Sequence, residues 1–402
     1  MTVRKPRLFY IGMVCTEAYV AAIGEDAYVA AAAAKMTAIS SALRKVGKRS
    51  VLVSLPFVGK GSLRQRGRAL RGDGFPSYFL PVWRFALIRK ICGTFALARF
   101  AVCVIKQGDT VLFYNHALEY LLALIILKYR GISVFQDIED VPTGKEAGVR
   151  WLIEVLCYRV MCNLTSPHKI TVSNQIGRCL EIGEFLAVHG VATPSVSTHV
   201  DPRWARLSSG GALRVHFGGS ILPSTGLDLF CDTVMNLECH SRRLARDVIF
   251  IVTGKGDLDR VRGLSASLRS GRLQIQVHEG VERAGYYELF HSCHASLSLK
   301  CPEGELAGTT FPSKVIEIAS AGLALIATSV SDVGDIFKED EAWIMQSANA
   351  DVLSSIIMEM AADPIEILRR ASAGQLSIQR RFGPSVVGAS LASFLDLRQS
   401  LA

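Results

Sequence analysis

The 402-residue chain has no apolar run long enough to cross a bilayer. The longest, Tyr120 to Leu127, is far shorter than the roughly 20 residues that a membrane-spanning helix needs. The first residues lack the long apolar stretch and small-residue cleavage site of a signal peptide. Internal repeats, heptads and low-complexity tracts are also missing. These absences argue against integral membrane, fibrous and repeat proteins, and they lead us to expect a cytoplasmic protein.

Metal-binding cysteine patterns are missing as well. The ten cysteines form no Cys-x-x-Cys pair and do not alternate with histidine at metal spacing. We interpret them as reduced thiols in packed cores, as expected in a reducing cytoplasm. We also expect no cofactor, no metal ion and no metal–diphosphate site of the Asp-x-Asp type.

Acidic residues are scarce in the first half. Residues 1–200 carry 25 Lys and Arg against 13 Asp and Glu, and the remainder carries 20 against 23, so net charges of +12 and −3 sum to +9. Between Lys35 and Lys106 there are 15 basic residues and one acidic residue, Asp73. Charge of one sign over one domain indicates a polyanionic partner, such as anionic lipid, nucleic acid or a phosphorylated acceptor. No nucleic-acid recognition motif accompanies the charge, so we expect no nucleic acid.

The sequence does have a regular alternation of short apolar strands and helical stretches. This alternation predicts parallel sheets covered by helices on both faces. In the first half the predicted strands are 8–13, 50–55, 77–81, 110–114, 131–136 and 169–173, and the predicted helices are 27–46, 84–106 and 118–128. After a predicted linker at 190–211, strands follow at 213–217, 247–253, 273–278, 295–299 and 324–327, with helices from about 226, near 286 and at 312–321.

We therefore predict an α/β chain of two doubly wound, Rossmann-like domains that face a cleft. The N-terminal domain spans residues 1–200, and the C-terminal domain spans 201–402. A last helix at about 384–400 crosses back to the first domain. Because ligands bind beyond the carboxyl ends of the strands in such sheets, residues directly after strands are the candidate site residues.

The second domain has two such candidate segments. After the strand Val215–Phe217, the segment Gly218–Gly219–Ser220 lets backbone N–H groups approach an anion, and the following helix N-terminus favours negative charge. A plain tight turn is the alternative. The second segment starts with Lys300 at a strand end, and its helix is closed by Gly322. Its candidate residues are Thr309, Thr310, Phe311, Pro312, Ser313, Lys314 and Glu317.

The second segment suits a nucleoside diphosphate. Its hydroxyl and N–H groups could bind the diphosphate, and the Glu317 carboxylate could accept both hydroxyls of a ribose. The alternative is a solvated first helical turn with an unrelated glutamate.

The stretch from Phe311 to Thr328 resembles the donor-site signature of the family 4 glycosyltransferases (glycosyl transferases group 1). The segments His278–Leu299 and Ile249–Gly256, the latter including Gly254, resemble the elements that precede this signature in the family. The resemblance covers about residues 213–340 well and the first half only in layout. It implies a GT-B fold with an N-terminal acceptor-binding domain and a C-terminal nucleotide-sugar-binding domain. It also implies a nucleoside-diphosphate sugar as donor, retention at the anomeric carbon and no metal.

Three positions depart from the family pattern. Ser220 and Thr225 stand where many members carry Arg and Lys, and Thr309 stands where many carry a first glutamate. The basic groups usually hold the donor phosphates. Lys300 and Lys314 flank the same loop and could supply the positive charge instead.

In the first domain, His116 follows a strand and resembles the family's cleft histidine near the reacting sugar. A histidine there could donate to the leaving phosphate or to a sugar hydroxyl, which makes it the catalytic candidate. A satisfied surface or capping histidine is the alternative. Gln136, Glu139 and Asp140 follow the next strand and could position acceptor hydroxyls, or cap the following segment.

The helix predicted at 84–106 mixes large apolar and basic residues. Arg84, Arg99 and Lys106 fall within about 60° of one another at helical spacing. Basic amphipathic helices lie on anionic membranes, so a peripheral contact with the inner face of the cell membrane is predicted. A core helix with a solvated basic face is the alternative. The predicted membrane-contact residues are Arg84, Arg89, Lys90 and Arg99.

These features together predict a metal-independent glycosyltransferase. It moves a sugar from a nucleoside-diphosphate sugar to a glycan acceptor, lipid-linked in our interpretation, in surface polysaccharide biosynthesis. One alternative is a GT-B sugar-nucleotide epimerase. Another is a non-catalytic sugar-nucleotide or glycan-binding relative, which the three departures favour.

Overall fold

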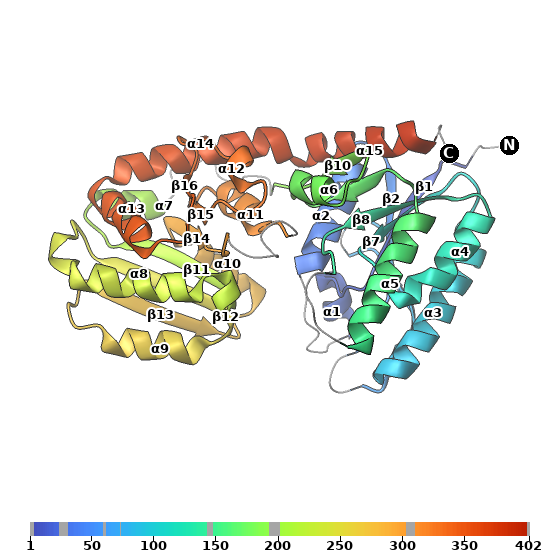
Figure 1. Ribbon diagram of the computed structural model, residues 1–402, viewed down its shortest axis with the longest axis horizontal. Coiled ribbons are helices and arrows are strands. Elements are labelled where there is room, and N and C mark those ends of the chain that lie inside the picture. Colours follow the sequence, from blue (N-terminus) through green and yellow to red (C-terminus); the bar gives the residue numbers. More distant parts are fainter. Residues whose placement is uncertain are drawn as a thin grey trace. The chain divides into compact units, whose positions relative to one another are not determined.

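The computed structural model describes residues 4–23, 31–58, 62–72, 74–142, 148–192, 202–302 and 310–399 (Figure 1). The chain forms two compact units, the first comprising residues 1–191 and 382–402 and the second comprising residues 192–381. The boundary thus lies at residue 191, where the sequence suggested 200. In the described part of the chain, no helix combines the length and apolar character needed to cross a membrane.

The first unit contains an eight-stranded sheet in the order β10-β9-β8-β7-β1-β2-β5-β4. Its neighbouring strands are parallel except for the β4–β5 pair, and β3 and β6 form a separate antiparallel pair. The strands are β1 (Arg7–Gly12), β2 (Arg49–Ser54), β3 (Arg64–Gln65), β4 (Arg68–Leu70), β5 (Ser77–Phe79), β6 (Val82–Trp83), β7 (Thr110–Tyr114), β8 (Ser133–Ile138), β9 (Lys169–Thr171) and β10 (Phe185–Ala187).

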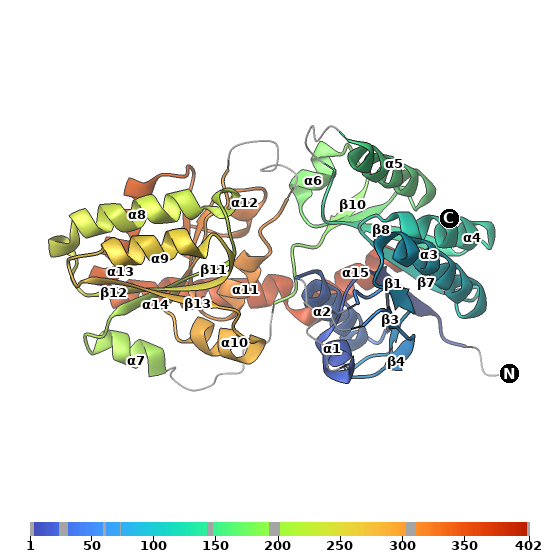
Figure 2. The same ribbon diagram turned by 90° about the horizontal axis from the view of Figure 1, so that it is seen from below.

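Helices cover both faces of this sheet, as the apolar strands require. Alternate residues of β1 point to opposite faces: Phe9 and Ile11 pack with α3, α4 and α5, whereas Leu8 and Tyr10 pack with α1, α2 and α15. The helices α2 and α15 lie side by side (Figure 2). The helices are α1 (Glu17–Ile23), α2 (Ala31–Lys45), α3 (Ala86–Cys103), the 3-10 helix η1 (Leu118–Tyr120), α4 (Leu121–Tyr129), α5 (Val149–Leu164), α6 (Asn174–Cys179) and α15 (Pro384–Gln399).

The second unit is built on a six-stranded parallel sheet in the order β13-β12-β11-β14-β15-β16. The strands are β11 (Leu213–Ile221), β12 (Val248–Gly256), β13 (Leu273–Glu279), β14 (Ala295–Ser298), β15 (Ala324–Thr328) and β16 (Trp343–Met345). The helices are α7 (Pro202–Ser208), α8 (Leu227–Cys239), α9 (Leu258–Ser267), α10 (Arg283–His291), α11 (Lys314–Ser320), α12 (Val333–Ile336), α13 (Ala350–Ala362) and α14 (Pro364–Phe382), with 3-10 helices η2 (Pro223–Thr225) and η3 (Ser241–Arg243).

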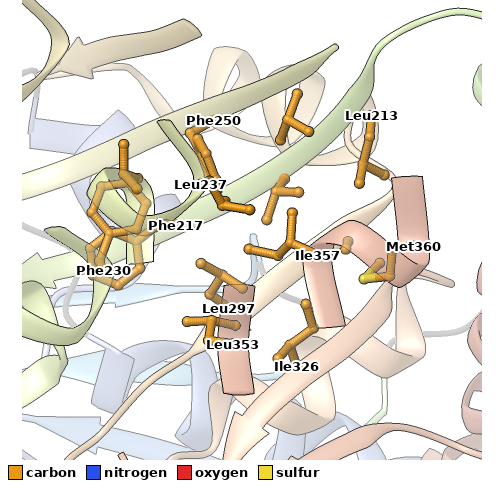
Figure 3. Close-up of a cluster of buried hydrophobic side chains, with 14 of the residues drawn as sticks. Leu213, Phe217, Phe230, Leu237, Phe250, Leu297, Ile326, Leu353, Ile357 and Met360 are labelled. Atoms are coloured by element: carbon orange, nitrogen blue, oxygen red, sulfur yellow. The ribbon is translucent and has the colours of Figure 1, made fainter. Parts of the chain in front are cut away.

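One face of this sheet holds the large apolar core shown in Figure 3. Phe217 of β11 stacks on Phe230 of α8 with ring centroids 4.6 Å apart, and Leu353 and Ile357 of α13 pack into the same cluster. Both units therefore have a core of their own, which fixes the strand ends that carry the candidate site residues.

The helix α7 corrects the sequence-based interpretation. The predicted linker at 190–211 contains α7, whose Arg203 guanidinium donates to the carbonyl oxygens of Cys293 at 3.1 Å and Gly322 at 2.9 Å. This anchor depends on segments about 90 and 120 residues away, so local periodicity could not predict it. The helix predicted at 27–46 is described as α2 from Ala31, and residues 27–30 lie outside the described residues.

Candidate active site

The Gly218–Gly219–Ser220 segment does not form the predicted loop after a strand. All three residues lie within β11, which pairs with β12 as far as Ile221 and Gly256. Gly219 and Gly254 face each other with φ of 107° and 135°, and a Cβ on Gly254 would lie 1.9 Å from the Gly219 carbonyl oxygen. The two glycines thus allow β11 and β12 to approach closely as a ribbon beyond the sheet.

The turn after this ribbon is held by Thr225. Its hydroxyl accepts from the Leu222 N–H at 3.1 Å and donates to the carbonyl oxygens of Leu222, at 2.9 Å, and Ser220. Gly226 follows in the left-handed conformation, and α8 begins. Thr225, where the family pattern has Lys, therefore stabilises the turn with its side chain.

Lys314 brings positive charge to the glycine segment. Its ammonium donates to the Gly218 carbonyl oxygen, and a Cβ on Gly219 would lie 3.3 Å from Lys314 Nζ. Burial lowers the pKa of Lys314 to about 8, although Glu317 acts in the opposite direction. A cation thus lies beside the segment in which Ser220 replaces the usual arginine.

Glu317 lies one helical turn after Lys314 on α11 and is half-buried. Burial raises the pKa of its carboxyl, while Lys314 and Arg283 lower it. The charge of Glu317 also helps to raise the pKa of the Tyr286 phenol, since the two groups lie near each other. The carboxylate has no hydrogen-bond partner among the described residues, so it can accept bonds from a ligand.

A buried histidine that the sequence did not single out lies beneath this segment. The ring nitrogens of His216 bond the Ser296 and Thr253 hydroxyls, each at 2.9 Å, which links β11 to β14 and β12. Burial and the charge of Lys314 hold its pKa well below the usual value, so the ring is neutral. A Cβ on Gly218 would lie 2.6 Å from His216 Nε2, which explains the glycine there. A lone polar residue in the apolar strand was the only signal in the sequence.

The remaining predicted donor residues lie around the start of α11. Lys300 donates to the Thr310 hydroxyl, Phe311 is buried, and Ser313 is exposed at the N-cap of α11 without a side-chain capping bond. Pro312 precedes Ser313 and is half-buried. Thr309 lies outside the described residues.

In the first unit, His116 lies just past β7 with its side chain 8% exposed. Its Nε2 is 3.9 Å from Glu154 Oε1, and its ring meets that of Tyr158 edge-on at 5.4 Å. Burial lowers the pKa of His116, while Glu154 and Asp140 raise it. Its Nδ1 is buried and has no hydrogen-bond partner among the described residues.

Asn115, which the sequence did not indicate, positions the acceptor-side candidates. It adopts a left-handed φ of 57°, and its Oδ1 accepts from the backbone N–H groups of Glu139 and Asp140 at 2.9 and 3.0 Å. Gln136 is fully buried, donates to the Asn115 carbonyl oxygen at 3.2 Å and accepts from the Thr165 hydroxyl at 3.4 Å. Gln136 therefore supports the segment from the interior and is not exposed to an acceptor.

The two carboxylates at this strand end have partners from distant segments. The Glu139 carboxylate pairs with Lys35 of α2, and the Asp140 carboxylate accepts from Asn115 Nδ2 at 3.1 Å. The fully buried Asp137 accepts from the Tyr10 hydroxyl and lies 3.4 Å from Lys35 Nζ. Burial lowers the pKa of Lys35, against the raising effect of Asp137.

The four predicted membrane-contact residues differ in exposure. Arg84, Lys90 and Arg99 are exposed, whereas Arg89 is half-buried with its guanidinium 5.5 Å from the centre of the Phe57 ring. Packing in the first unit therefore removes Arg89 from a fully solvated position.

The predictions about metal sites and cysteines can be compared with the described residues. They contain no group of three or more His, Cys, Asp or Glu that could hold a metal ion. The chain does contain one Asp-x-Asp sequence, contrary to expectation, but Asp257 caps α9 at 3.2 Å from the Arg260 N–H, and Asp259 pairs with Arg262 at 2.7 Å. The ten cysteines are free, yet the interpretation as core thiols is wrong for the four exposed ones: Cys103, Cys179, Cys239 and Cys301.

Comparisons with known proteins agree with this architecture. Residues 247–385 match the family model described as "Glycosyl transferase-like", and no curated protein matches the sequence. Similar solved structures include sucrose-phosphate synthase from Thermosynechococcus elongatus (TM-score 0.68, 12% identity, covering 98% of this chain and 100% of that one). Others are the catalytic domain of starch synthase IV from Arabidopsis thaliana bound to ADP and acarbose (0.66, 11%, 99% and 100%) and Anabaena HepE in complex with UDP (0.63, 12%, 97% and 100%).

The fold and the family model lead to the same conclusion. The structural similarity extends over nearly the whole chain, so the fold is GT-B. The family model covers much of the second unit, which contains Lys314 and Glu317. The chain is a glycosyltransferase of the GT-B type.

Proposed function

We propose that this glycosyltransferase binds a nucleoside-diphosphate sugar at the carboxyl end of the β11–β12 ribbon and the start of α11. The supporting observation is the juxtaposition of Lys314, the Gly218–Gly219 segment and Glu317. A diphosphate needs a cation and close backbone approach, and a ribose needs an acceptor for its hydroxyls. Anabaena HepE was solved with UDP-glucose and starch synthase IV with ADP, which are ligands of the class proposed here.

Catalysis is proposed to be mainly electrostatic. Lys314, together with hydroxyl and N–H groups of residues 310–313, stabilises the negative charge that develops on the departing diphosphate. No metal is required in this proposal, because the ammonium supplies the positive charge. The transfer is proposed to proceed with retention at the anomeric carbon.

His116 is the proposed catalytic residue of the first unit. A neutral imidazole can hydrogen-bond to a hydroxyl of the reacting sugar, and the Glu154 carboxylate lies 3.9 Å from the His116 Nε2. Glu139 and Asp140 are proposed to position acceptor hydroxyls, with Lys35 and Asn115 holding their carboxylates.

The acceptor is proposed to be a lipid-linked glycan intermediate of surface polysaccharide biosynthesis. The support is the basic charge of the first unit, including the exposed Arg84, Lys90 and Arg99. Such charge attracts the anionic inner face of a cell membrane, where lipid-linked intermediates lie. The protein is accordingly proposed to be cytoplasmic and peripherally membrane-associated.

The test is a screen of UDP-, GDP- and ADP-sugars with and without a lipid extract from the source cell. Acceptor-dependent release of the nucleoside diphosphate, with a glycosylated lipid detected by mass spectrometry, supports the proposal. Conversion of the donor to an isomer without acceptor would instead identify an epimerase. Donor binding without turnover under all conditions would identify a non-catalytic relative.

A further inference from the structure

A set of large apolar side chains is exposed on the first unit. Leu87 is 71% exposed and Phe95 64% exposed on α3, and Leu152 is 61% exposed on α5. Side chains of this size are usually covered in a soluble domain, and a large exposed group of them marks an interaction site. We name this set the α3–α5 apolar face; it consists of Phe85, Leu87, Ile88, Ile91, Phe95, Val149, Leu152, Ile153 and Leu156.

The sequence spacing shows that the exposure is organised. On α5 the residues 149, 152, 153 and 156 have the spacing of one helical face, yet all four are exposed. On α3 the residues 87, 91 and 95 form a similar exposed row, while Gly93, Leu97 and Ala101 face the core. Each helix thus has one apolar side in the unit and a second apolar side in solvent.

The two rows belong to one region of the unit. The helix α4 contacts both α3 and α5 (Figure 1). In addition, the positive charge of Lys90 on α3 acts to lower the pKa of the Cys157 thiol on α5. The α5 row lies in the N-terminal half of its helix, and the α3 row runs from the start of α3 to just past its middle. The helix α5 follows β8, so its start lies towards the carboxyl ends of the parallel strands, where His116 and Glu139 are found.

The charges around this face select the partner. Residues 84–106 contain five basic residues, Arg84, Arg89, Lys90, Arg99 and Lys106, and no acidic residue. Apolar side chains flanked by Lys and Arg match the interface of an anionic bilayer, where the chains enter the acyl boundary and the cations meet the headgroups. A symmetric pair of copies would oppose the same basic patch to itself, which is unfavourable.

We propose that the α3–α5 apolar face inserts into an anionic lipid bilayer and holds the carboxyl edge of the first sheet at the membrane. The opposite side of α5 contributes Glu154 and Tyr158 to His116, so one helix joins the lipid contact to the candidate catalytic histidine. This inference rests on the proposed function, because it explains how a lipid-linked acceptor reaches that edge.

The test is co-flotation of the full chain with vesicles of phosphatidylcholine containing phosphatidylglycerol, compared with pure phosphatidylcholine. In the test variant Leu87, Phe95, Leu152 and Leu156 are all replaced by Ser. We expect its affinity for the anionic vesicles to fall by about tenfold or more, since lost apolar insertion weakens binding even at low salt. The matched control replaces four exposed apolar residues of the second unit by Ser: Val352, Ile365, Leu368 and Leu376.

Support requires that the control floats like the wild type and that both variants keep the wild-type melting temperature and nucleotide binding. Unchanged flotation of the test variant, or no flotation of the wild type, overturns the inference. A wild-type dimer that becomes a monomer in the test variant, without vesicle binding, also overturns it and assigns the face to a second copy. A protein that floats but never consumes a donor with any acceptor would contradict the proposed function instead.

Discussion

At the scale of single residues, the candidate donor site depends on two side chains one turn apart on α11. Lys314 reaches the Gly218 carbonyl oxygen, and Glu317 lies half-buried with Lys314 and Arg283 near it. Each charge shifts the pKa of the other group: the carboxylate raises the pKa of the lysine, and the lysine lowers the pKa of the carboxyl. A ligand that contacts both side chains would therefore meet a positive and a negative charge at a defined distance from each other.

The first prediction concerns Glu317→Gln, which keeps the shape of the side chain and removes its charge. Charge-assisted hydrogen bonds to a ribose contribute about 1.5–3 kcal/mol each, so donor affinity should fall by about tenfold or more. Calorimetric titration with nucleoside diphosphates measures the affinity, and thermal melting shows whether the variant stays folded. The control, Glu339→Gln, changes an exposed carboxylate of the same unit. Near-normal donor binding by a well-folded Glu317→Gln variant would show that the ribose lies elsewhere.

The second prediction is a pH dependence of donor binding. The Lys314 ammonium loses its proton near pH 8 instead of near its ordinary value of 10.5. The affinity for the diphosphate should therefore fall as pH rises through about 8. Lys314→Met should bind more weakly at pH 7 and show no such step between pH 6.5 and 9.5. A wild-type profile that is flat in this range would contradict a role for the Lys314 charge.

The same pKa shift acts on stability. Between about pH 8 and 10.5 the unfolded chain holds the Lys314 proton more tightly than the folded one. Stability from this group therefore rises with pH across that window, opposite to the expected change in donor affinity. The opposite signs distinguish a binding effect from partial unfolding.

At the scale of elements, the β11–β12 ribbon depends on glycine at close contacts. The glycines at 219, 254 and 256 have φ between 107° and 135°, which side chains with a Cβ rarely adopt. In the ribbon, the Gly218 carbonyl oxygen accepts a hydrogen bond from Lys314. Two residues earlier in β11, His216 bonds the Ser296 hydroxyl of β14. The backbone of the ribbon, rather than its side chains, therefore determines the shape of this part of the site.

The third prediction is that Gly254→Ala destabilises the second unit. Its Cβ would lie 1.9 Å from the Gly219 carbonyl oxygen, so the strands must separate. Strain of this kind costs about 2 kcal/mol or more, which urea unfolding would measure. Gly263→Ala is the control, because Gly263 lies in α9 with nothing within 4 Å of the added carbon; it should be neutral or stabilising by up to about 1 kcal/mol. Equal stability of the two variants would contradict this account.

At the scale of the whole molecule, the chain supports two separate cores. The end of the chain belongs to the first unit, where Leu391 of α15 is fully buried with Met36 and Ile39 of α2. A Cβ on Gly388 would lie 2.2 Å from the Ala42 carbonyl oxygen, so the two helices approach closely. Residues far apart in sequence thus complete one core.

The fourth prediction uses this division. Leu391→Ala should cost the first unit about 2–5 kcal/mol through the cavity it leaves. Saturating nucleoside diphosphate should raise the melting temperature of the second unit, which holds the proposed site. Calorimetry of the variant should therefore show two transitions, of which only the upper one moves with nucleotide. A single transition would contradict separate unfolding of the two units, and a ligand shift of the lower transition would contradict the assignment of the donor to the second unit.

The fifth prediction is that turnover does not need a metal. EDTA should leave the rate of donor consumption essentially unchanged, because Lys314 supplies the charge that a metal ion would supply. The release of nucleoside diphosphate measures the rate. Loss of turnover with EDTA and its recovery with manganese would contradict the prediction.

The sequence was most informative where structure is local. The strand at 110–114 was predicted with the bounds that β7 has, because an apolar run between polar turns is a local pattern. The GT-B fold followed from the resemblance of residues 213–340 to a known signature, and the fold is confirmed. The assignment to family 4 in particular stays a prediction.

Only the tertiary structure decided which side chains meet. Lys35 and Tyr10 reach Asp137 across more than 100 residues, and Arg203 binds carbonyl groups about 90 and 120 residues away. Likewise, burial of Gln136 and exposure of Leu152 depend on what packs against each strand and helix. Sequence periodicity determines which faces are apolar, but the covering of a face is a long-range property, because it depends on the closure of distant segments around a common core.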